Sequence, residues 1–171
     1  KLAAAQYNGH IFTSSDSGAT WIERTNSPIA EWLWITSSAD GTRLAALTSD
    51  LSGDGGYIYT SADSGATWVQ RNTPLNVPQQ WYSIDSSADG SKLVAVEGGG
   101  MIWISSDYGV TWSFTSAGSR YWQSVSCSSD CQKIMAATVN GYIYKSLDGG
   151  STWIREDSAG SRAWQQVSIS G

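Results

Sequence analysis

The chain has 171 residues, a formal net charge of −5, a pI of about 4.6 and only 15% charged residues. An acidic chain is poorly suited to nucleic acid or to an anionic membrane surface, so we expect neither as a partner. No run approaches the roughly 20 apolar residues of a membrane-spanning helix, so we also expect no membrane insertion. Ten Trp, eight Tyr and eighteen Gly favour an all-β domain of short strands joined by tight turns.

An eight-residue pattern, Ser-x-Asp-x-Gly-x-Thr-Trp, occurs four times along the chain. Ser and Asp oxygens accept hydrogen bonds from turn amides, and Gly adopts positive φ without steric cost, so each copy predicts a hairpin turn. The Trp that ends each copy then begins the returning strand and can bury a large apolar surface. The turn residues are Ser14, Asp16, Gly18 and Trp21; Ser61, Asp63, Gly65 and Trp68; Ser105, Asp107, Gly109 and Trp112; and Ser146, Asp148, Gly150 and Trp153.

In this pattern the chain resembles the Asp-box (BNR) repeat proteins, and the resemblance covers essentially the whole sequence. It implies a β-propeller. Asp-box repeats occur in sialidases, xyloglucan-cleaving glycosidases, sortilin-type receptors, photosystem II assembly factors and propeller lectins. The resemblance also implies that the box is a device of the fold, on the face away from an active centre, and it leaves the function open.

The four box Trp residues are 47, 44 and 41 residues apart, which is typical of blades with four antiparallel strands. We therefore predict one propeller domain over residues 1–171. Its repeats cover about 1–31, 32–80, 81–121 and 122–163, and a closing strand follows at 164–171. In each full repeat a strand starting at a Trp leads to a Ser-Ala-Asp-Gly-type turn, two further strands, the box and a fourth strand.

The two ends of the sequence match in phase. Lys1–Ala4 aligns with the second strand at Lys92–Ala95, whereas Trp164–Gly171 aligns with the first strand that begins at Trp32. The C-terminal strand is therefore expected to complete the N-terminal blade, which closes the ring and removes unpaired sheet edges. Two alternatives satisfy the same alignment: two chains that share strands in a homodimer or a head-to-tail assembly, and a larger propeller of which these repeats are half.

Cys127 and Cys131 flank a tight turn and occupy the positions of Ser86 and Gly90 one repeat earlier. Residues placed in this way across a turn lie close enough for a disulfide, and the alternative is a pair of free thiols. A disulfide would favour a secreted or extracytoplasmic protein. Two Cys and the single His10 cannot complete a four-ligand metal site, so we expect no metal and no cofactor.

The search for catalytic residues favours a protein that is not an enzyme. His10 occupies the strand position of Tyr57 and Tyr142, where packing or surface exposure explains it better than a catalytic triad. None of the arginines lies in a sialidase-like motif. The box aspartates belong to turns, and the other acidic candidates for a glycosidase pair, Glu31, Asp50, Asp54 and Glu97, share no repeated context.

A binding protein is the better interpretation, and its ligand is expected on the face that carries the loops between blades. Two of these loops repeat Ser-Ala-Gly-Ser-Arg shortly before a Trp, and Arg donors beside Trp faces suit a hydroxylated ligand such as a sugar. The candidate ligand-binding residues are Arg120, Trp122, Arg162, Trp164, Trp32 and Trp81. In the alternative interpretation the tryptophans fill the space between blades and the arginines cap loops.

We therefore expect a non-enzymatic, lectin-like carbohydrate-binding propeller. Two alternatives remain: a scaffold or assembly-factor propeller that binds a protein partner over a broad face, and a fragment of a larger glycosidase- or sialidase-like Asp-box protein.

Overall fold

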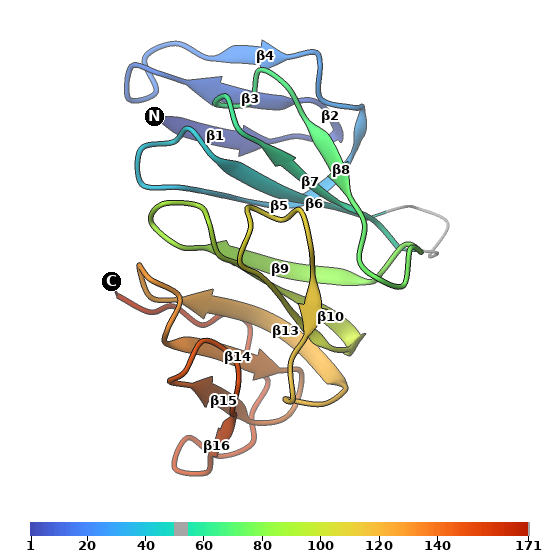
Figure 1. The fold of residues 1–171 in the computed structure, drawn as a ribbon, viewed down its shortest axis with the longest axis vertical. Helices are drawn as coiled ribbons and strands as arrows, with labels where there is room; N and C mark the ends of the chain where they lie inside the picture. The colour runs from blue at the N-terminus through green and yellow to red at the C-terminus, as the bar shows by residue number, and fades with distance from the viewer. Residues whose placement is uncertain (50–54, 171) are drawn as a thin grey trace.

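The computed structural model describes residues 1–49 and 55–170. In these residues every regular element is a β-strand, and no helix is long and apolar enough to cross a membrane. The strands form four antiparallel groups, here called blades 1 to 4, which follow one another from the blue to the red end of the chain in Figure 1.

Each blade is built from consecutive strands. Blade 1 contains β1 (Leu2–Ala5), β3 (Ile11–Ser14) and β4 (Ile22–Arg24). Blade 2 contains β5 (Ala30–Ser37), β6 (Leu44–Ser49), β7 (Ile58–Ser61) and β8 (Val69–Arg71). Blade 3 contains β9 (Trp81–Ser86), β10 (Leu93–Gly100), β11 (Ile102–Ser105) and β12 (Ser113–Phe114). Blade 4 contains β13 (Arg120–Cys127), β14 (Ile134–Thr138), β15 (Ile143–Ser146) and β16 (Ile154–Glu156). The short strand β2 (Tyr7–Gly9) reaches from blade 1 to β5 of blade 2.

The second strands of blades 2 and 3 are deeply buried, because each of these blades has a neighbouring blade on both sides. Leu44, Ala45, Ala46 and Leu47 of β6 are all buried, and so is Leu93–Val96 of β10. A strand buried on both faces is apolar without the alternation of a half-exposed strand, and small residues let the sheets approach closely. The apolar runs of the sequence therefore lie in these inner strands.

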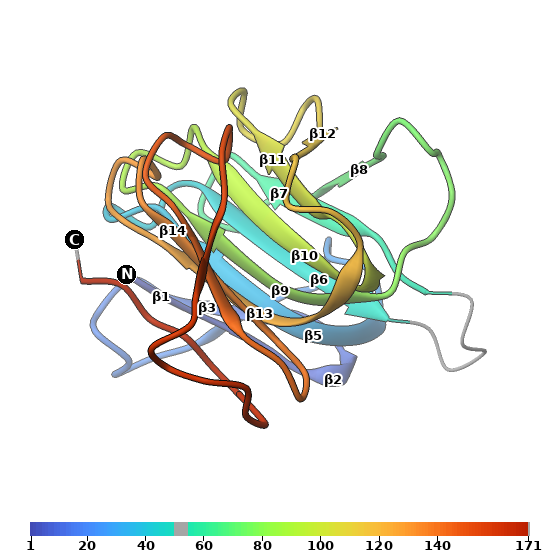
Figure 2. The ribbon, with the colours of Figure 1, turned by 90° about the horizontal axis from the view of Figure 1, so that it is seen from below.

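Tryptophans fill the wedges between blades. Trp32 contacts Tyr59 edge-on, with ring centroids 5.2 Å apart, and lies 6.0 Å from Trp68. Two blades further along the chain, Trp122 makes the equivalent contacts, with Tyr144 at 5.3 Å and with Trp153 at 6.5 Å. The buried residues accordingly separate into three clusters, one at each junction between successive blades. Figure 2 shows the sheets at these junctions from a second direction.

The turns and loops lie on two opposite faces of the blades, here called the box face and the loop face. On the box face, a relay of backbone bonds joins equivalent turns: the Ala39 amide donates to the Ala88 carbonyl, and the Ala88 amide to the Ser129 carbonyl, both at 2.7 Å. On the loop face, the link between the second and third strands of a blade pairs with the entry to the next blade, as in Gly56 with Gln79. Backbone bonds therefore fix blades 2, 3 and 4 to one another on both faces. On the box face, blades 1 and 2 are joined by side-chain bonds, from Lys1 to Ser64 and from Asn26 to the Ala66 carbonyl.

The structure does not show the predicted closure of the ring. β1 pairs with β3, and blade 1 has three strands in the described part of the chain. The segment 164–170 instead lies beside β13: the Val167 amide donates to Ser124 Oγ and the Ile169 amide to Ser126 Oγ, both at 3.2 Å. Residue 171 lies outside the described residues. The terminal segment therefore follows blade 4 in the same way that each blade follows the one before, and β1 is paired with β3.

Candidate binding surfaces

The four box turns have the same hydrogen bonds. In the second, Ser61 Oγ accepts from the Gly65 amide and donates to Asp63 Oδ1, both at 2.8 Å. Asp63 also accepts from the amide and the hydroxyl of Thr67, at 2.8 and 2.7 Å. These bonds lower the pKa of the box carboxylates, to about 2 for Asp16 and Asp148. The carboxylates are therefore ionised acceptors that hold the turn closed.

The box glycines take the positive φ that the pattern requires, with values from 80° to 92° at Gly18, Gly65, Gly109 and Gly150. The residue before each glycine is also left-handed, and it differs between blades: Ser17, Ser64, Tyr108 and Gly149. The side chain at this second position is therefore the variable part of an otherwise constant turn.

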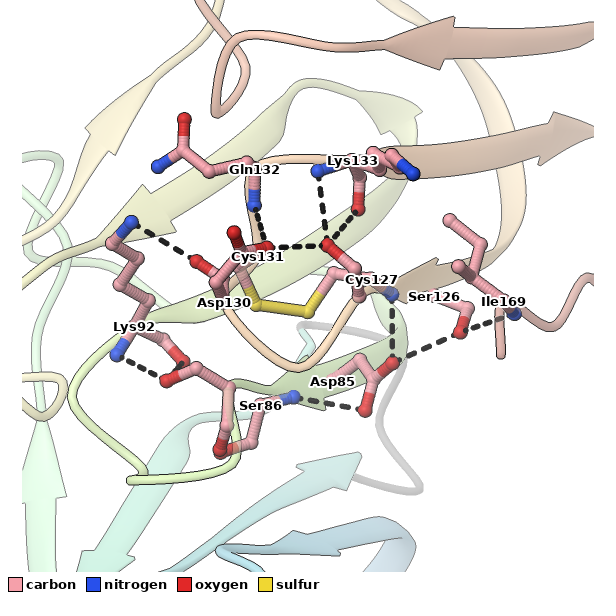
Figure 3. Close-up of a disulfide and its surroundings, with 12 residues drawn as sticks. Asp85, Ser86, Lys92, Ser126, Cys127, Asp130, Cys131, Gln132, Lys133 and Ile169 are labelled. Carbon is pink, nitrogen blue, oxygen red and sulfur yellow. Dashed lines mark hydrogen bonds between the residues drawn. A yellow bond between two sulfur atoms is a disulfide. The ribbon is translucent and has the colours of Figure 1, made fainter. Parts of the chain in front are cut away.

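Cys127 and Cys131 form a disulfide across the turn between β13 and β14, with Cα atoms 4.9 Å apart (Figure 3). Cys131 has φ of 47°, at the position of Gly41 and Gly90 in the other blades. Asp85 lies beside this turn and accepts from the Cys127 amide at 2.8 Å and from the Ser126 hydroxyl at 3.0 Å. The disulfide thus adds a covalent link to a turn that Asp85 of blade 3 already fixes by hydrogen bonds.

The structure buries three of the four tryptophans that were predicted to contact a ligand. Trp32 and Trp81 are each 3% exposed and Trp122 is fully buried, so their rings pack between blades and present no face to a ligand. Trp164 is half-buried and donates from Nε1 to the Gly141 carbonyl at 2.9 Å, much as Trp32 donates to Gly9 at 3.0 Å. The recurrence of Trp at one strand position reflects packing, which was the alternative interpretation.

The two predicted arginines differ in their surroundings. Arg120 is half-buried: its Nε donates to Tyr144 Oη at 3.0 Å, it bonds the Ala117 carbonyl, and its guanidinium lies 4.5 Å from the Tyr144 ring centroid. Arg162 is exposed and donates from Nε to the Ala159 carbonyl at 2.9 Å. Arg120 therefore closes its own loop, and of the two only Arg162 projects from the surface.

The loop face exposes a set of apolar and aromatic side chains that the sequence analysis did not select. Tyr121 is 74% exposed, and Tyr82 and Leu33 are also exposed. Tyr82 and Tyr121 both lie against the end of β10, since a Cβ built at Gly98 would meet the Tyr82 ring at 2.3 Å and one built at Gly99 would meet the Tyr121 ring at 3.4 Å. We call these three side chains the loop-face patch. Leu33 and Tyr82 follow the buried Trp32 and Trp81 by one residue, and strand alternation at those positions is the signal that could have found them.

A cleft of about 360 Å³ adjoins this patch between blades 2 and 3. It is lined by Leu33, Ser49, Gln79, Gln80, Trp81 and Tyr82. Its walls combine apolar side chains with amide and hydroxyl groups, a composition typical of surfaces that bind peptides and other polar chains.

His10, Glu31 and Glu97 make structural hydrogen bonds, although Glu31 Oε1 is buried without a hydrogen-bond partner. His10 Nδ1 donates to the Ser27 carbonyl at 2.7 Å, and Ser27, 1% exposed, donates its own hydroxyl to the Arg24 carbonyl. Glu31 accepts from the Ser49 hydroxyl at 2.8 Å, and Glu97 lies 3.3 Å from the Met101 amide. Asp50 and Asp54 lie outside the described residues. Residues 1–49 and 55–170 hold no cluster of three His, Cys, Asp or Glu side chains that could bind a metal.

Successive antiparallel blades, joined on both faces and packed through tryptophan wedges, define the β-propeller class of proteins. No protein-family model matches the chain, and no curated protein sequence matches it either.

Solved structures share the fold. An ancestral GH74 enzyme is 16% identical with a TM-score of 0.70, and the match covers 95% of this chain and 23% of that one. YCF48 bound to D1 peptide is 14% identical with a TM-score of 0.68, covering 98% and 53%. Chaetomium thermophilum Sqt1, bound to the N-terminus of the ribosomal protein L10, is 15% identical with a TM-score of 0.61, covering 92% and 45%. At these identities the likeness concerns the fold, and the chain spans about half the length, or less, of these proteins.

Proposed function

We propose that this protein is a non-enzymatic binding propeller that holds a segment of a partner protein against its loop face. The loop-face patch is the observation that carries this proposal, because contiguous exposed apolar and aromatic groups beside a cleft mark interaction sites. Tyr82 and Tyr121 offer large rings with a polar tip, the type of side chain that dominates binding energy at protein interfaces.

The solved structures support a protein partner as the first candidate. YCF48 is bound to D1 peptide and Sqt1 to the N-terminus of the ribosomal protein L10, so other chains of this fold hold polypeptide segments. A fold by itself does not define a function, so the proposal for this chain rests on its own exposed side chains.

A non-catalytic role is supported by the use of the carboxylates. The box aspartates are occupied in turns, and Asp85 accepts from the amides of Ser86 and Cys127 at 2.9 and 2.8 Å. A glycosidase needs one carboxylic acid and one carboxylate that face the substrate together. The disulfide further supports an oxidising compartment, outside the cytosol, as the location of the protein.

The proposal is tested by selecting a random-peptide phage library against the purified full chain. We expect enriched peptides whose binding falls at least tenfold in the double variant Tyr82→Ser, Tyr121→Ser. Leu147→Ser is the matched control, because Leu147 is 61% exposed but lies in the box turn of blade 4, on the opposite face. Peptides that bind the double variant as tightly as the natural protein would exclude the loop-face patch as their site.

A carbohydrate ligand on the loop face is the second candidate. The exposed rings of Tyr82 and Tyr121 can stack on sugar CH groups, and Arg162 projects a guanidinium from the same face. The buried tryptophans do not contribute to this surface. Binding on a glycan array that disappears in the same double variant would favour this second candidate over the first.

A further inference from the structure

Three equivalent clefts occur on the box face, one at each junction between successive blades. Each lies between the start of the second strand in one blade, at Lys1, Arg43 or Lys92, and the box turn of the next blade. Their volumes differ: about 190 Å³ between blades 1 and 2, 110 Å³ between blades 2 and 3, and 280 Å³ between blades 3 and 4. The same backbone arrangement therefore encloses very different amounts of space.

The side chain at the variable left-handed position of the box turn is larger where the cleft is smaller. The smallest cleft has Tyr108, whose ring lies 4.0 Å from the guanidinium carbon of Arg43. In the intermediate cleft, Ser64 accepts a bond from Lys1 Nζ at 2.9 Å. The largest cleft has Gly149 at this position. Tyr108 has φ of 63°, a conformation unfavourable for a bulky residue, so the contacts of its ring with Arg43 must offset backbone strain.

The open cleft between blades 3 and 4 combines an apolar floor with a polar rim. Leu93, Ile104, Trp112 and Ile134 line the floor. Leu93, Trp112 and Ile134 are only 2–4% exposed, so the partly buried Ile104 is the member of the floor most accessible to a ligand. The Trp112 indole is fixed in place, because its Nε1 donates to the Gly109 carbonyl at 3.0 Å. A rigid apolar floor of this size can cover the CH face of one small ring.

The rim of the same cleft carries both donors and acceptors. Lys92 donates from Nζ to the Asp130 carbonyl at 3.0 Å, which holds its ammonium at the rim. Asp148 is ionised, because bonds from Thr152 and Ser146 lower its pKa to about 2. Within the box turn its Oδ1 accepts from Ser146 and from the Thr152 amide and its Oδ2 accepts from the Thr152 hydroxyl, so Oδ2 keeps one acceptor site for a ligand. The side-chain amide of Gln132 makes no hydrogen bond within the described residues and offers both a donor and an acceptor. The charged side chains among the lining residues are one cation, Lys92, and one anion, Asp148, so the formal charge of the lining is zero.

We propose that the cleft between blades 3 and 4 binds a neutral polyhydroxylated molecule of the size of one hexose unit. Its volume of about 280 Å³ is at the lower end of the range for small-molecule sites, which excludes large ligands. The apolar floor receives the CH face of the ring, and the rim satisfies the hydroxyl groups. This site lies on the face opposite to the loop-face patch and is independent of the protein partner proposed above.

The test closes the cleft with the side chain that the protein itself uses one blade earlier. Gly149→Tyr reproduces Tyr108: a Cβ at Gly149 has room, since its nearest atoms lie 3.6 Å away, and its φ of 68° imposes the same left-handed strain that Tyr108 carries at 63°. The matched control is Ser17→Tyr, which places the same residue at the same left-handed position of blade 1, where it lines none of the three clefts. The purified full chain and both variants are applied to an array of mono- and oligosaccharides, and the best monosaccharide is titrated by calorimetry.

We expect the natural protein and Ser17→Tyr to bind the same sugar, and Gly149→Tyr to bind it at least tenfold more weakly. Both Tyr variants should melt below the natural protein, because each places a bulky residue at positive φ, and both should be folded at the temperature of the titration. Gln132→Ala, which alters an exposed side chain of the rim, should weaken binding as well. It is the second test variant if Gly149→Tyr does not fold. The absence of any binding by the natural protein would overturn the proposal. Binding that persists in Gly149→Tyr and is lost in the Tyr82→Ser, Tyr121→Ser variant would also overturn it, and would assign the sugar to the loop face.

Discussion

The Val167 amide donates a hydrogen bond to Ser124 Oγ at 3.2 Å, and this bond repeats, one blade further on, the bond from the Val125 amide to Ser83 Oγ at 3.3 Å. Serine hydroxyls on the first strand of one blade thus accept hydrogen bonds from backbone amides of the segment that begins the next blade. These two equivalent bonds show that segment 164–170 lies beside blade 4 in the same way that β13 lies beside blade 3.

Removing the Ser124 hydroxyl should release the terminal segment. In Ser124→Ala we expect faster hydrogen exchange at the Val167 amide, because this amide loses its acceptor. Hydrogen exchange measured by mass spectrometry or NMR tests this expectation, with Ser158→Ala in an exposed loop as the control. Unchanged protection of Val167 would show that another contact holds the segment.

Replacing Gly65 by Val should destabilise the second box turn by about 1–2 kcal/mol or more, because a β-branched residue is unfavourable at a φ of 84°. A Cβ there would also lie 3.0 Å from Thr13 Cγ2. Urea denaturation measures the loss, and Ala62→Val, at an exposed position of the same turn, should change stability by less than about 0.5 kcal/mol. Equal midpoints for the two variants would contradict the role of Gly65.

The two loop arginines should differ in their effect on stability. Arg120→Ala removes the bond to Tyr144 and the ring contact, and we expect a loss of about 1–2 kcal/mol in the free energy of unfolding. Arg162→Ala should cost less than about 0.5 kcal/mol, because Arg162 is exposed. Denaturant titrations of both variants provide the comparison, and a larger loss for Arg162→Ala would reverse this assignment.

The disulfide should stabilise the turn between β13 and β14 by about 2 kcal/mol, the value expected for closing a loop of this length. Cys127→Ser with Cys131→Ser loses this contribution and also keeps a non-glycine residue at positive φ. Cys127→Ser with Cys131→Gly restores the residue type of Gly41 and Gly90, so it should be more stable than the first variant by about 1 kcal/mol. Thermal denaturation of both variants measures the difference, and the opposite order would show that the turn does not require glycine-like freedom.

The lowered pKa values of the turn aspartates predict a loss of stability in acid. Asp16, Asp40, Asp89 and Asp148 have folded-state pKa values of about 2, compared with 3.8 for a free side chain. Their contribution is complete above about pH 4 and is lost as the pH falls towards 2, because the unfolded chain binds protons first. The urea midpoint measured between pH 5 and pH 2 should fall across this window. The fall should be smaller in Asp148→Asn, and an equal fall would exclude the carboxylate as a cause.

Local patterns in the sequence predicted most of the fold. The Ser-x-Asp-x-Gly-x-Thr-Trp copies predict the hairpins because their bonds join residues at most four positions apart, such as Ser61 to Gly65. The first strands at Trp32, Trp81 and Trp122 lie where their pattern indicated, and the Cys127–Cys131 pair needed only the geometry of one turn.

Only the tertiary structure decided how the blades use these residues. Whether Trp122 is exposed or buried depends on the neighbouring blade that covers it, and a repeat pattern contains no information about that contact. The position of segment 164–170 was likewise decided by Ser124 and Ser126 on another blade, since the same strand sequence fits the edge of either blade. The cleft beside Gly149 arises because two turns 40 or more residues apart in sequence meet, and the absence of a side chain in one of them leaves space that no local pattern predicts.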